Sequence, residues 1–208
     1  MPQPALFVFA KQPVPGLVKT RLQPEHSPER AAEIATLLIR ETVGLAVSTW
    51  PGQVYLCGAP TANHPLFEDL ARTYDIEMVD QGEGDLGQRM HRALAFGIEE
   101  HGAAAVLGCD VPHCPWEELD EASEVLGQGR SVLGPTDDGG YYLIGLTTPY
   151  IELFEEMAWG KPTVLLETLR RAEERAIEFT LLTSLRDIDT AVDLWLAAQR
   201  YEPLRRFL

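Results

Sequence analysis

Residues 103–110 read Ala103-Ala-Ala-Val-Leu-Gly108-Cys-Asp110, a run of small and branched apolar residues that ends at an acidic one. A strand with one solvent-exposed face would alternate apolar and polar residues, so this unbroken run predicts a strand buried on both faces. Such strands lie in the middle of parallel sheets that carry helices on either side. The stretch therefore predicts an α/β protein, with Asp110 at the carboxyl end of a central strand.

Similar apolar runs recur on both sides of this strand and alternate with segments of helical periodicity. The expected strands are residues 5–10, 53–58, 77–79, 103–108, 131–134, 141–145 and 179–182. The expected helices are residues 28–48, 66–74, 86–100, 116–126, 150–157, 163–172 and 190–201. This order predicts a three-layer αβα sandwich with a mostly parallel mixed sheet, formed by a single domain over residues 1–208.

The composition limits the range of partners. The net charge of −15 repels nucleic acids and anionic membranes, so neither is an expected partner. No apolar stretch approaches the ~18 residues that a membrane helix needs. The three cysteines provide no disulfide framework and suit a reducing compartment. We therefore expect a cytoplasmic protein.

The loop after the first expected strand concentrates positive charge. It reads Lys11-Gln-Pro-Val-Pro-Gly16-Leu-Val-Lys19-Thr-Arg21. Lys19 offers a point charge and Arg21 a planar fork, a combination that suits a di- or triphosphate. Gly16 permits close approach of the backbone. The glycine spacing is not that of a Walker A loop, and a solvated basic turn is the alternative interpretation.

Acidic residues follow the central strand and precede the last expected helix. Asp110 is well placed to hold Mg²⁺, which prefers one or two carboxylates together with substrate phosphate oxygens, and capping of the next helix or turn is the alternative role. Asp189 either supplies a second carboxylate or caps the helix. Cys109, His113 and Cys114 raise zinc as another possibility, but their spacing contains no C-x-x-C pair.

Two glycine-containing segments complete the candidate residues. Residues 134–142 read Gly134-Pro-Thr-Asp-Asp138-Gly-Gly140-Tyr-Tyr142, and their bend either lets backbone amides approach a substrate or serves only as a turn. Residues 81–89 read Gln81-Gly-Glu-Gly-Asp85-Leu-Gly87-Gln-Arg89. This second segment could lie against a nucleotide base, but its residues alone favour an ordinary strand-to-helix turn with Asp85 as the N-cap.

Five motifs, in order across nearly the whole chain, resemble the nucleotide-diphospho-sugar transferase superfamily, which has the glycosyltransferase-A fold. They are FAKQPVPGLVKTRL (9–22), QGEGDLGQRM (81–90), GCDVPH (108–113), GPTDDGGYYLIGL (134–146) and DIDTAVDL (187–194). More narrowly, the chain resembles the bacterial "transferase 1" group, DUF2064, whose members are considered glycosyltransferases. It is also similar to the 2-phospho-L-lactate guanylyltransferases.

The resemblance implies a role for each matching residue. Lys19, Arg21 and Asp110 would carry catalysis, and Asp110 and Asp189 would hold Mg²⁺. The nucleotide would lie against Ala10, Lys11, Gly16, Gln81, Asp85 and Gly87. The acceptor would lie against Asp138, Gly139, Gly140 and Tyr141. The Asp-x-Asp signature of many glycosyltransferases is absent at Asp110, which favours nucleotidyl transfer over glycosyl transfer.

We therefore expect a Mg²⁺-dependent nucleotide-binding transferase. It would move a nucleotidyl group from a nucleoside triphosphate to a small phosphate or hydroxyl acceptor. A glycosyltransferase with a nucleotide-sugar donor is the first alternative, and a non-catalytic nucleotide-binding module is the second. The expected partners are the nucleotide or nucleotide-sugar and the small acceptor, and a homodimer is compatible with the resemblance. The sequence names neither the base nor the acceptor.

Overall fold

The computed structural model describes residues 3–208. Within them, one 7-stranded sheet has the strand order β3-β2-β1-β4-β6-β5-β7. Its strands are β1 (Ala5–Lys11), β2 (Val54–Ala59), β3 (Glu77–Asp80), β4 (Ala104–Gly108), β5 (Ser131–Pro135), β6 (Tyr141–Leu146) and β7 (Phe179–Leu181). Only β6 runs against its neighbours β4 and β5, while the other pairs are parallel. The predicted mostly parallel mixed sheet is confirmed.

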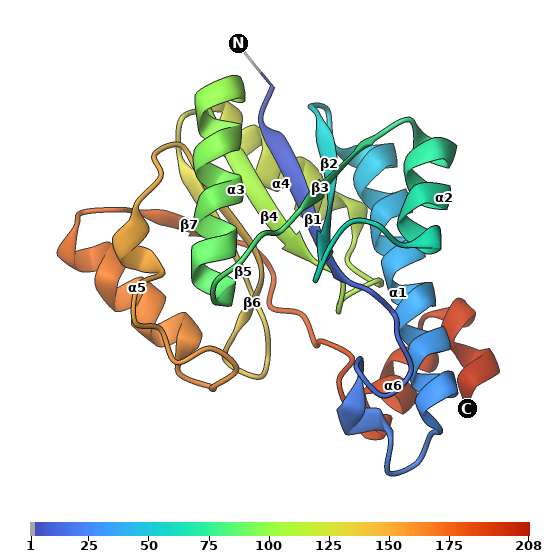
Figure 1. Cartoon of the computed structure of the whole chain (residues 1–208). Coiled ribbons are helices and arrows are strands. Elements are labelled where there is room, and N and C mark those ends of the chain that lie inside the picture. Colours follow the sequence, from blue (N-terminus) through green and yellow to red (C-terminus); the bar gives the residue numbers. More distant parts are fainter. Residues whose placement is uncertain (1–2) are drawn as a thin grey trace.

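Helices cover both faces of this sheet (Figure 1). They are α1 (Pro28–Thr49), α2 (Pro65–Tyr74), α3 (Leu86–His101), α4 (Trp116–Gly127), α5 (Val164–Glu174) and α6 (Ala191–Ala198). The core on one face joins the sheet to α1, α2 and α4, and the core on the other face joins it to α3 and α5. The structure therefore has the predicted three layers. None of the helices within residues 3–208 is long and apolar enough to cross a membrane.

The long helix α1 begins where its sequence predicts. The Ser27 side chain accepts a hydrogen bond from the backbone N–H of Arg30, at 3.2 Å, and so satisfies one of the free donors of the first turn. Pro28 occupies the first helical position, where no N–H is needed. Ten residues of the helix are buried: those in its C-terminal half pack on the sheet, and those in its N-terminal half pack on Leu22 and the end of the chain.

A third core lies beyond the sheet, where the end of the chain packs on the start of α1. It contains Leu22, Ile188, and residues of α1, α6 and the 3-10 helix Glu202–Phe207. Leu22 and Ile188 are both fully buried there. This core therefore brings the cationic loop after β1 next to the acidic segment before α6.

Two helical predictions are wrong in part. Only the short 3-10 helix Ile151–Leu153 forms within the helix expected at residues 150–157. Leu153, Phe154 and Met157 are buried at helical spacing, but Glu156 has a φ of 50°, which a right-handed helix cannot contain. The helix expected at residues 190–201 is shorter: α6 has Thr190 as its N-cap and ends at Ala198, and a separate 3-10 helix follows at Glu202–Phe207.

Candidate functional site

A cleft of about 880 Å³ opens at the carboxyl ends of β1 and β4. Parallel pairing places Phe9 of β1 opposite Gly108 of β4, so the loops that follow these strands leave the sheet side by side. A backbone hydrogen bond of 2.9 Å from the N–H of Ile188 to the carbonyl of Asp110 adds the segment before α6 to the same edge. Three distant stretches of chain therefore meet at one cleft, as the sequence predicts.

Lys19 lies between two carboxylates of the cleft. Its Nζ is 2.6 Å from Asp110 Oδ1 and 2.9 Å from Asp189 Oδ1, and it donates to the carbonyl of Ile188 at 2.5 Å. Burial by itself lowers the pKa of this ammonium, but Asp110 and then Asp189 outweigh burial and hold the pKa above its usual value. The backbone of Lys19 is left-handed, with a φ of 45°, a conformation that costs energy for a residue with a side chain.

Asp189 also binds Arg21, so this carboxylate fixes both cations. Arg21 Nη1 is 3.0 Å from Asp189 Oδ2, while two thirds of the guanidinium side chain stays open to solvent. Partial burial raises the pKa of Asp189, but Lys19 and Arg21 overcome that effect and hold the pKa below its usual value. Arg21 therefore has free hydrogen-bond donors that can face an anion in the cleft.

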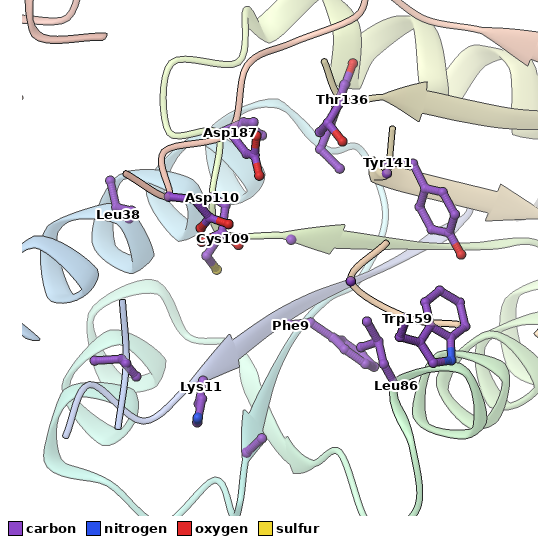
Figure 2. A pocket seen from close by; sticks show the side chains of 18 of the residues that line it. Phe9, Lys11, Leu38, Leu86, Cys109, Asp110, Thr136, Tyr141, Trp159 and Asp187 are labelled. Atoms are coloured by element: carbon purple, nitrogen blue, oxygen red, sulfur yellow. The ribbon is translucent and has the colours of Figure 1, made fainter. Parts of the chain in front are cut away.

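Asp187 adds a further carboxyl group to this edge. Desolvation, followed by repulsion from Asp138, Asp189 and Asp110, raises the pKa of Asp187 to about 6. Figure 2 shows Asp187 and Asp110 close together on one side of the cleft. We call this region the charged end, formed by Lys19, Arg21, Asp110, Asp187 and Asp189.

The charged end offers oxygen donors that fit a divalent cation. The Lys19 ammonium is a stand-in cation there, because it already lies between Asp110 and Asp189. Within residues 3–208, no group of three or more His, Cys, Asp or Glu side chains is arranged to hold a metal ion. A pair of carboxylates suits Mg²⁺ or Mn²⁺ when substrate oxygens complete the coordination.

The zinc alternative does not fit. Cys109 and Cys114 are buried and free. Burial raises the pKa of the Cys109 thiol, and it raises the pKa of the Cys114 thiol to about 12. Zinc needs thiolates, which such an environment disfavours. Cys109 therefore belongs to the core of the sheet.

The residues predicted for the nucleotide divide into two groups. Lys11 and Gln81 line the cleft, whereas Ala10, Gly16, Asp85 and Gly87 are not among the lining residues that the structure describes. Asp85 is the N-cap of α3, with its side chain accepting from the N–H of Gln88 at 2.8 Å. The strand-to-helix turn that the residues alone favour is therefore present.

Gln81 is buried and joins the ends of two strands. Its Nε2 donates to the carbonyl of Ala10 at 3.2 Å and to that of Cys57 at 2.9 Å. Its Oε1 accepts from Arg89 at 3.3 Å, and Arg89 itself lines the cleft. Gln81 thus sets the position of a cation that sequence reasoning did not select.

The residues predicted for the acceptor also gather at the cleft. Asp138, Gly140 and Tyr141 line it, and Gly139 lies behind them in the turn. Asp138 Oδ1 accepts from Thr136 Oγ1 at 2.6 Å and from the N–H of Gly140 at 3.0 Å, so its carboxylate shapes this turn.

Apolar and aromatic side chains form the other end of the cleft, and of these sequence reasoning selected only Tyr141. Figure 2 shows Phe9, Leu86, Tyr141 and Trp159 on the side away from Asp110 and Asp187. We call this region the aromatic end, formed by Phe9, Leu86, Met90, Tyr141 and Trp159. For Trp159 the signal in the sequence is the aromatic and cationic turn at residues 159–161, although its residues alone favour a plain helix start.

Comparison with known proteins shows the family. The model named "Uncharacterized protein conserved in bacteria (DUF2064)" matches residues 42–161, which is more than half of the chain. The chain belongs to the DUF2064 family. No curated protein matches this DUF2064 member.

Solved structures share the fold. A candidate nucleotide-diphospho-sugar transferase from Desulfovibrio desulfuricans G20 is 26% identical, with a TM-score of 0.86 over 99% of this chain and 91% of its own. 4-Diphosphocytidyl-2C-methyl-D-erythritol synthase from Anaerococcus prevotii is 9% identical, with a TM-score of 0.61 over 96% of both chains.

A synthase in complex with a metal ion and a nucleotide has the same fold. Glucosyl-3-phosphoglycerate synthase from Mycobacterium tuberculosis, in complex with Mn²⁺, uridine diphosphate and glucosyl-3-phosphoglycerate, is 12% identical, with a TM-score of 0.54 over 96% of this chain and 76% of its own. At 9% and 12% identity, the last two structures show the fold alone. The DUF2064 member therefore has the predicted glycosyltransferase-A, nucleotidyltransferase-like fold.

Proposed function

We propose that this protein is a divalent-metal-dependent transferase. It moves a nucleotidyl group from a nucleoside triphosphate to a small phosphate or hydroxyl acceptor. The observation that carries the proposal is the convergence of Lys19 and Arg21 with Asp110 and Asp189 at one end of the cleft. Two cations held by carboxylates in a cleft at a strand edge suit the phosphates of a nucleotide.

Lys19 and Arg21 bind the phosphates and neutralise the charge that develops on the leaving pyrophosphate. Arg21 can do so without leaving Asp189, because most of its side chain is open to solvent. Lys19 is held on three sides and must exchange at least one carboxylate contact for a phosphate oxygen. Asp110 and Asp189 would hold Mg²⁺, which when bound supplies further positive charge to the phosphate oxygens.

Lys11 and Gln81 lie on the side of the cleft where β2 ends, and we assign the nucleoside to that side. Lys11 pairs in register with Ala59, which also lines the cleft. Ala10, Asp85 and Gly87 do not contact the nucleoside. Ala10 accepts a hydrogen bond from Gln81, Asp85 caps α3, and Gly87 lets α3 pack closely on Trp159. Gly16, which has a φ of 81°, lies in the loop that connects the nucleoside side of the cleft to Lys19 and Arg21.

The acceptor lies between Asp138, Gly140 and Tyr141. Its oxygen attacks the α-phosphorus, so that one P–O bond forms while the bond to pyrophosphate breaks, and a hydroxyl acceptor releases its proton to solvent water. No covalent intermediate with the protein is required. Positioning and charge stabilisation supply the rate enhancement in reactions of this kind.

Glycosyl transfer from a nucleotide-sugar is the second candidate function. It is favoured by the likeness to the D. desulfuricans protein and by the shared fold of the M. tuberculosis synthase. The two reactions differ in their products, because only nucleotidyl transfer releases pyrophosphate from a triphosphate.

The test incubates the protein with each nucleoside triphosphate, Mg²⁺ or Mn²⁺, and a panel of small phosphates and sugars. We expect pyrophosphate release that requires an acceptor. Release of a nucleoside diphosphate from nucleotide-sugars instead would favour the second candidate. If a nucleotide binds but neither reaction occurs, both transferase functions are contradicted and the protein is a non-catalytic nucleotide-binding module.

A further inference from the structure

The aromatic end of the cleft carries more apolar surface than binding of phosphates requires. Leu86 is 38% exposed although it borders the cleft, and Phe9, Tyr141 and Trp159 are only partly buried. Apolar walls with a few polar groups are typical of sites for small organic ligands. The aromatic end therefore has the surface of a binding site for a small organic group, which binding of phosphates at the charged end does not require.

Trp159 packs directly on the backbone of α3 because residue 87 is a glycine. A Cβ at Gly87 would lie 2.6 Å from Trp159 Cζ2 and 2.7 Å from the carbonyl of Phe154, distances that real Cβ atoms do not show. On its other side, Trp159 makes an edge-to-face contact with Tyr141, at 6.4 Å between ring centroids. The indole is thus fixed between α3 and β6.

A second glycine holds the opposite side of the same loop. A Cβ at Gly139 would lie 2.1 Å from the carbonyl of Pro162, and the φ of Gly139 is 89°. The N–H of Leu165 donates to the carbonyl of Gly139 at 2.9 Å. Residues 159–162 are therefore packed closely against α3 on one side and against the β5–β6 turn on the other. The side chains of the aromatic end are held in fixed positions as a result.

Polar groups without partners accompany these rings. Trp159 Nε1 and Tyr141 OH are buried and have no hydrogen-bond partner among residues 3–208. Lys161 lines the cleft, is exposed, and forms no ion pair within the same described range. A ligand here meets flat apolar surfaces beside one available positive charge.

We propose that the aromatic end is a binding site for an organic anion that carries a flat apolar ring. The ring packs against Trp159 and Leu86, and the anionic group pairs with Lys161. As the acceptor of the reaction proposed above, such a molecule would be an aromatic phosphate or carboxylate, and that assignment rests on the proposed function. A nucleobase is also a flat ring attached to an anion. We assign it instead to the side of the cleft where β2 ends, which is lined by Lys11, Ala59 and Gln81.

The test compares phenylphosphonate with methylphosphonate, which share the anion and differ in the ring. The protein is labelled with 5-fluorotryptophan, and Trp159→Phe assigns one of the four tryptophan signals. We expect phenylphosphonate to shift the Trp159 signal selectively and to bind about tenfold more tightly than methylphosphonate, since burial of a ring is favourable. In Leu86→Ala, the affinities for phenylphosphonate and methylphosphonate should become nearly equal.

Controls separate the ring site from other effects. Trp116→Ala, at a residue that is 55% exposed and absent from the cleft lining, should keep the tenfold ratio. Lys161→Met should weaken phenylphosphonate but leave the binding of phenol unchanged. Circular dichroism and thermal melting verify that each variant is folded, and Leu86→Ala serves if a substitution at Trp159 does not fold.

Three results would overturn the proposal: equal affinity for the two phosphonates, a shift at another tryptophan, or a Trp159 signal that responds to nucleoside monophosphates but not to phenylphosphonate. The last result would assign the aromatic end to the base. None of these results bears on pyrophosphate release, so the failure of this site and the failure of the proposed transfer are distinguishable.

Discussion

The two ends of the cleft are held together by different means. The charged end depends on contacts between residues far apart in the sequence, such as Lys19 with Asp110 and Asp189. The aromatic end depends on the absence of side chains at Gly87 and Gly139, which lets a loop pack closely on both sides. Substitutions at the charged end should therefore change chemistry, whereas those at the aromatic end should change shape and selectivity.

The largest effect is expected from Asp110→Asn. This change keeps the size of the side chain but removes the charge that faces Lys19 and the metal position. We expect turnover to fall by about a thousandfold, a typical loss when charge stabilisation of a transition state is removed. Pyrophosphate release measures it, with Asp69→Asn in the surface pair with Arg40 as the matched control.

Lys19→Met should separate binding of phosphates from binding of the metal. Turnover should fall about a hundredfold, because a cation that faces the phosphates is lost. Affinity for Mn²⁺ without nucleotide should rise about tenfold, because the ammonium no longer competes for Asp110 and Asp189. Electron paramagnetic resonance of free Mn²⁺ measures the affinity, and Arg40→Met, in the surface pair with Asp69, is the control. Unchanged or weaker Mn²⁺ binding would contradict the role of Lys19 as a stand-in cation.

Gly87→Ala tests the aromatic end through packing alone. The added methyl group must displace Trp159 or α3, and we expect a loss of roughly 1–3 kcal/mol in the free energy of unfolding. The preference for phenylphosphonate over methylphosphonate should fall as well, with little change in Mn²⁺ binding. Gly127→Ala is the matched control, because a Cβ there meets nothing within 4 Å. A stable variant with full ring selectivity would show that the position of Trp159 does not matter.

The smallest effect is expected from Arg21→Gln. The guanidinium is largely exposed, so its pairing with Asp189 contributes little to stability. We expect a three- to tenfold rise in KM for the triphosphate, with a weaker dependence of binding on salt. A titration of KM against salt concentration checks this. A loss of turnover as large as that of Asp110→Asn would contradict this smaller role and would mean that Arg21 contributes as much to the chemical step as Asp110 does.

Much of the charged end could be predicted from the sequence, because residue types there reveal their chemistry. Apolar strands with a regular alternation of helices predict the sheet, and strand ends then predict that Lys19, Arg21 and Asp110 converge. The pairing of Asp189 with both cations was not predicted, since the backbone contact between Ile188 and Asp110 that brings it there is a tertiary contact.

The aromatic end could not be predicted in the same way. Phe9 belongs to a strand and Trp159 to an irregular loop, and neither shows in sequence that it faces a cleft. Gly87 was predicted to lie against a base, but its contact is with Trp159. The helix expected at residues 150–157 is lost for a related reason, because the left-handed backbone at Glu156 interrupts an apolar spacing that otherwise suits a helix.

Calorimetric titration with the nucleoside triphosphates, with and without Mg²⁺, tests most directly whether the charged end holds nucleotide phosphates. We predict that at least one triphosphate binds, that Mg²⁺ strengthens its binding, and that Asp110→Asn abolishes the Mg²⁺ effect. The absence of binding by any nucleotide at millimolar concentration, or the same Mg²⁺ effect in Asp110→Asn, would contradict this assignment.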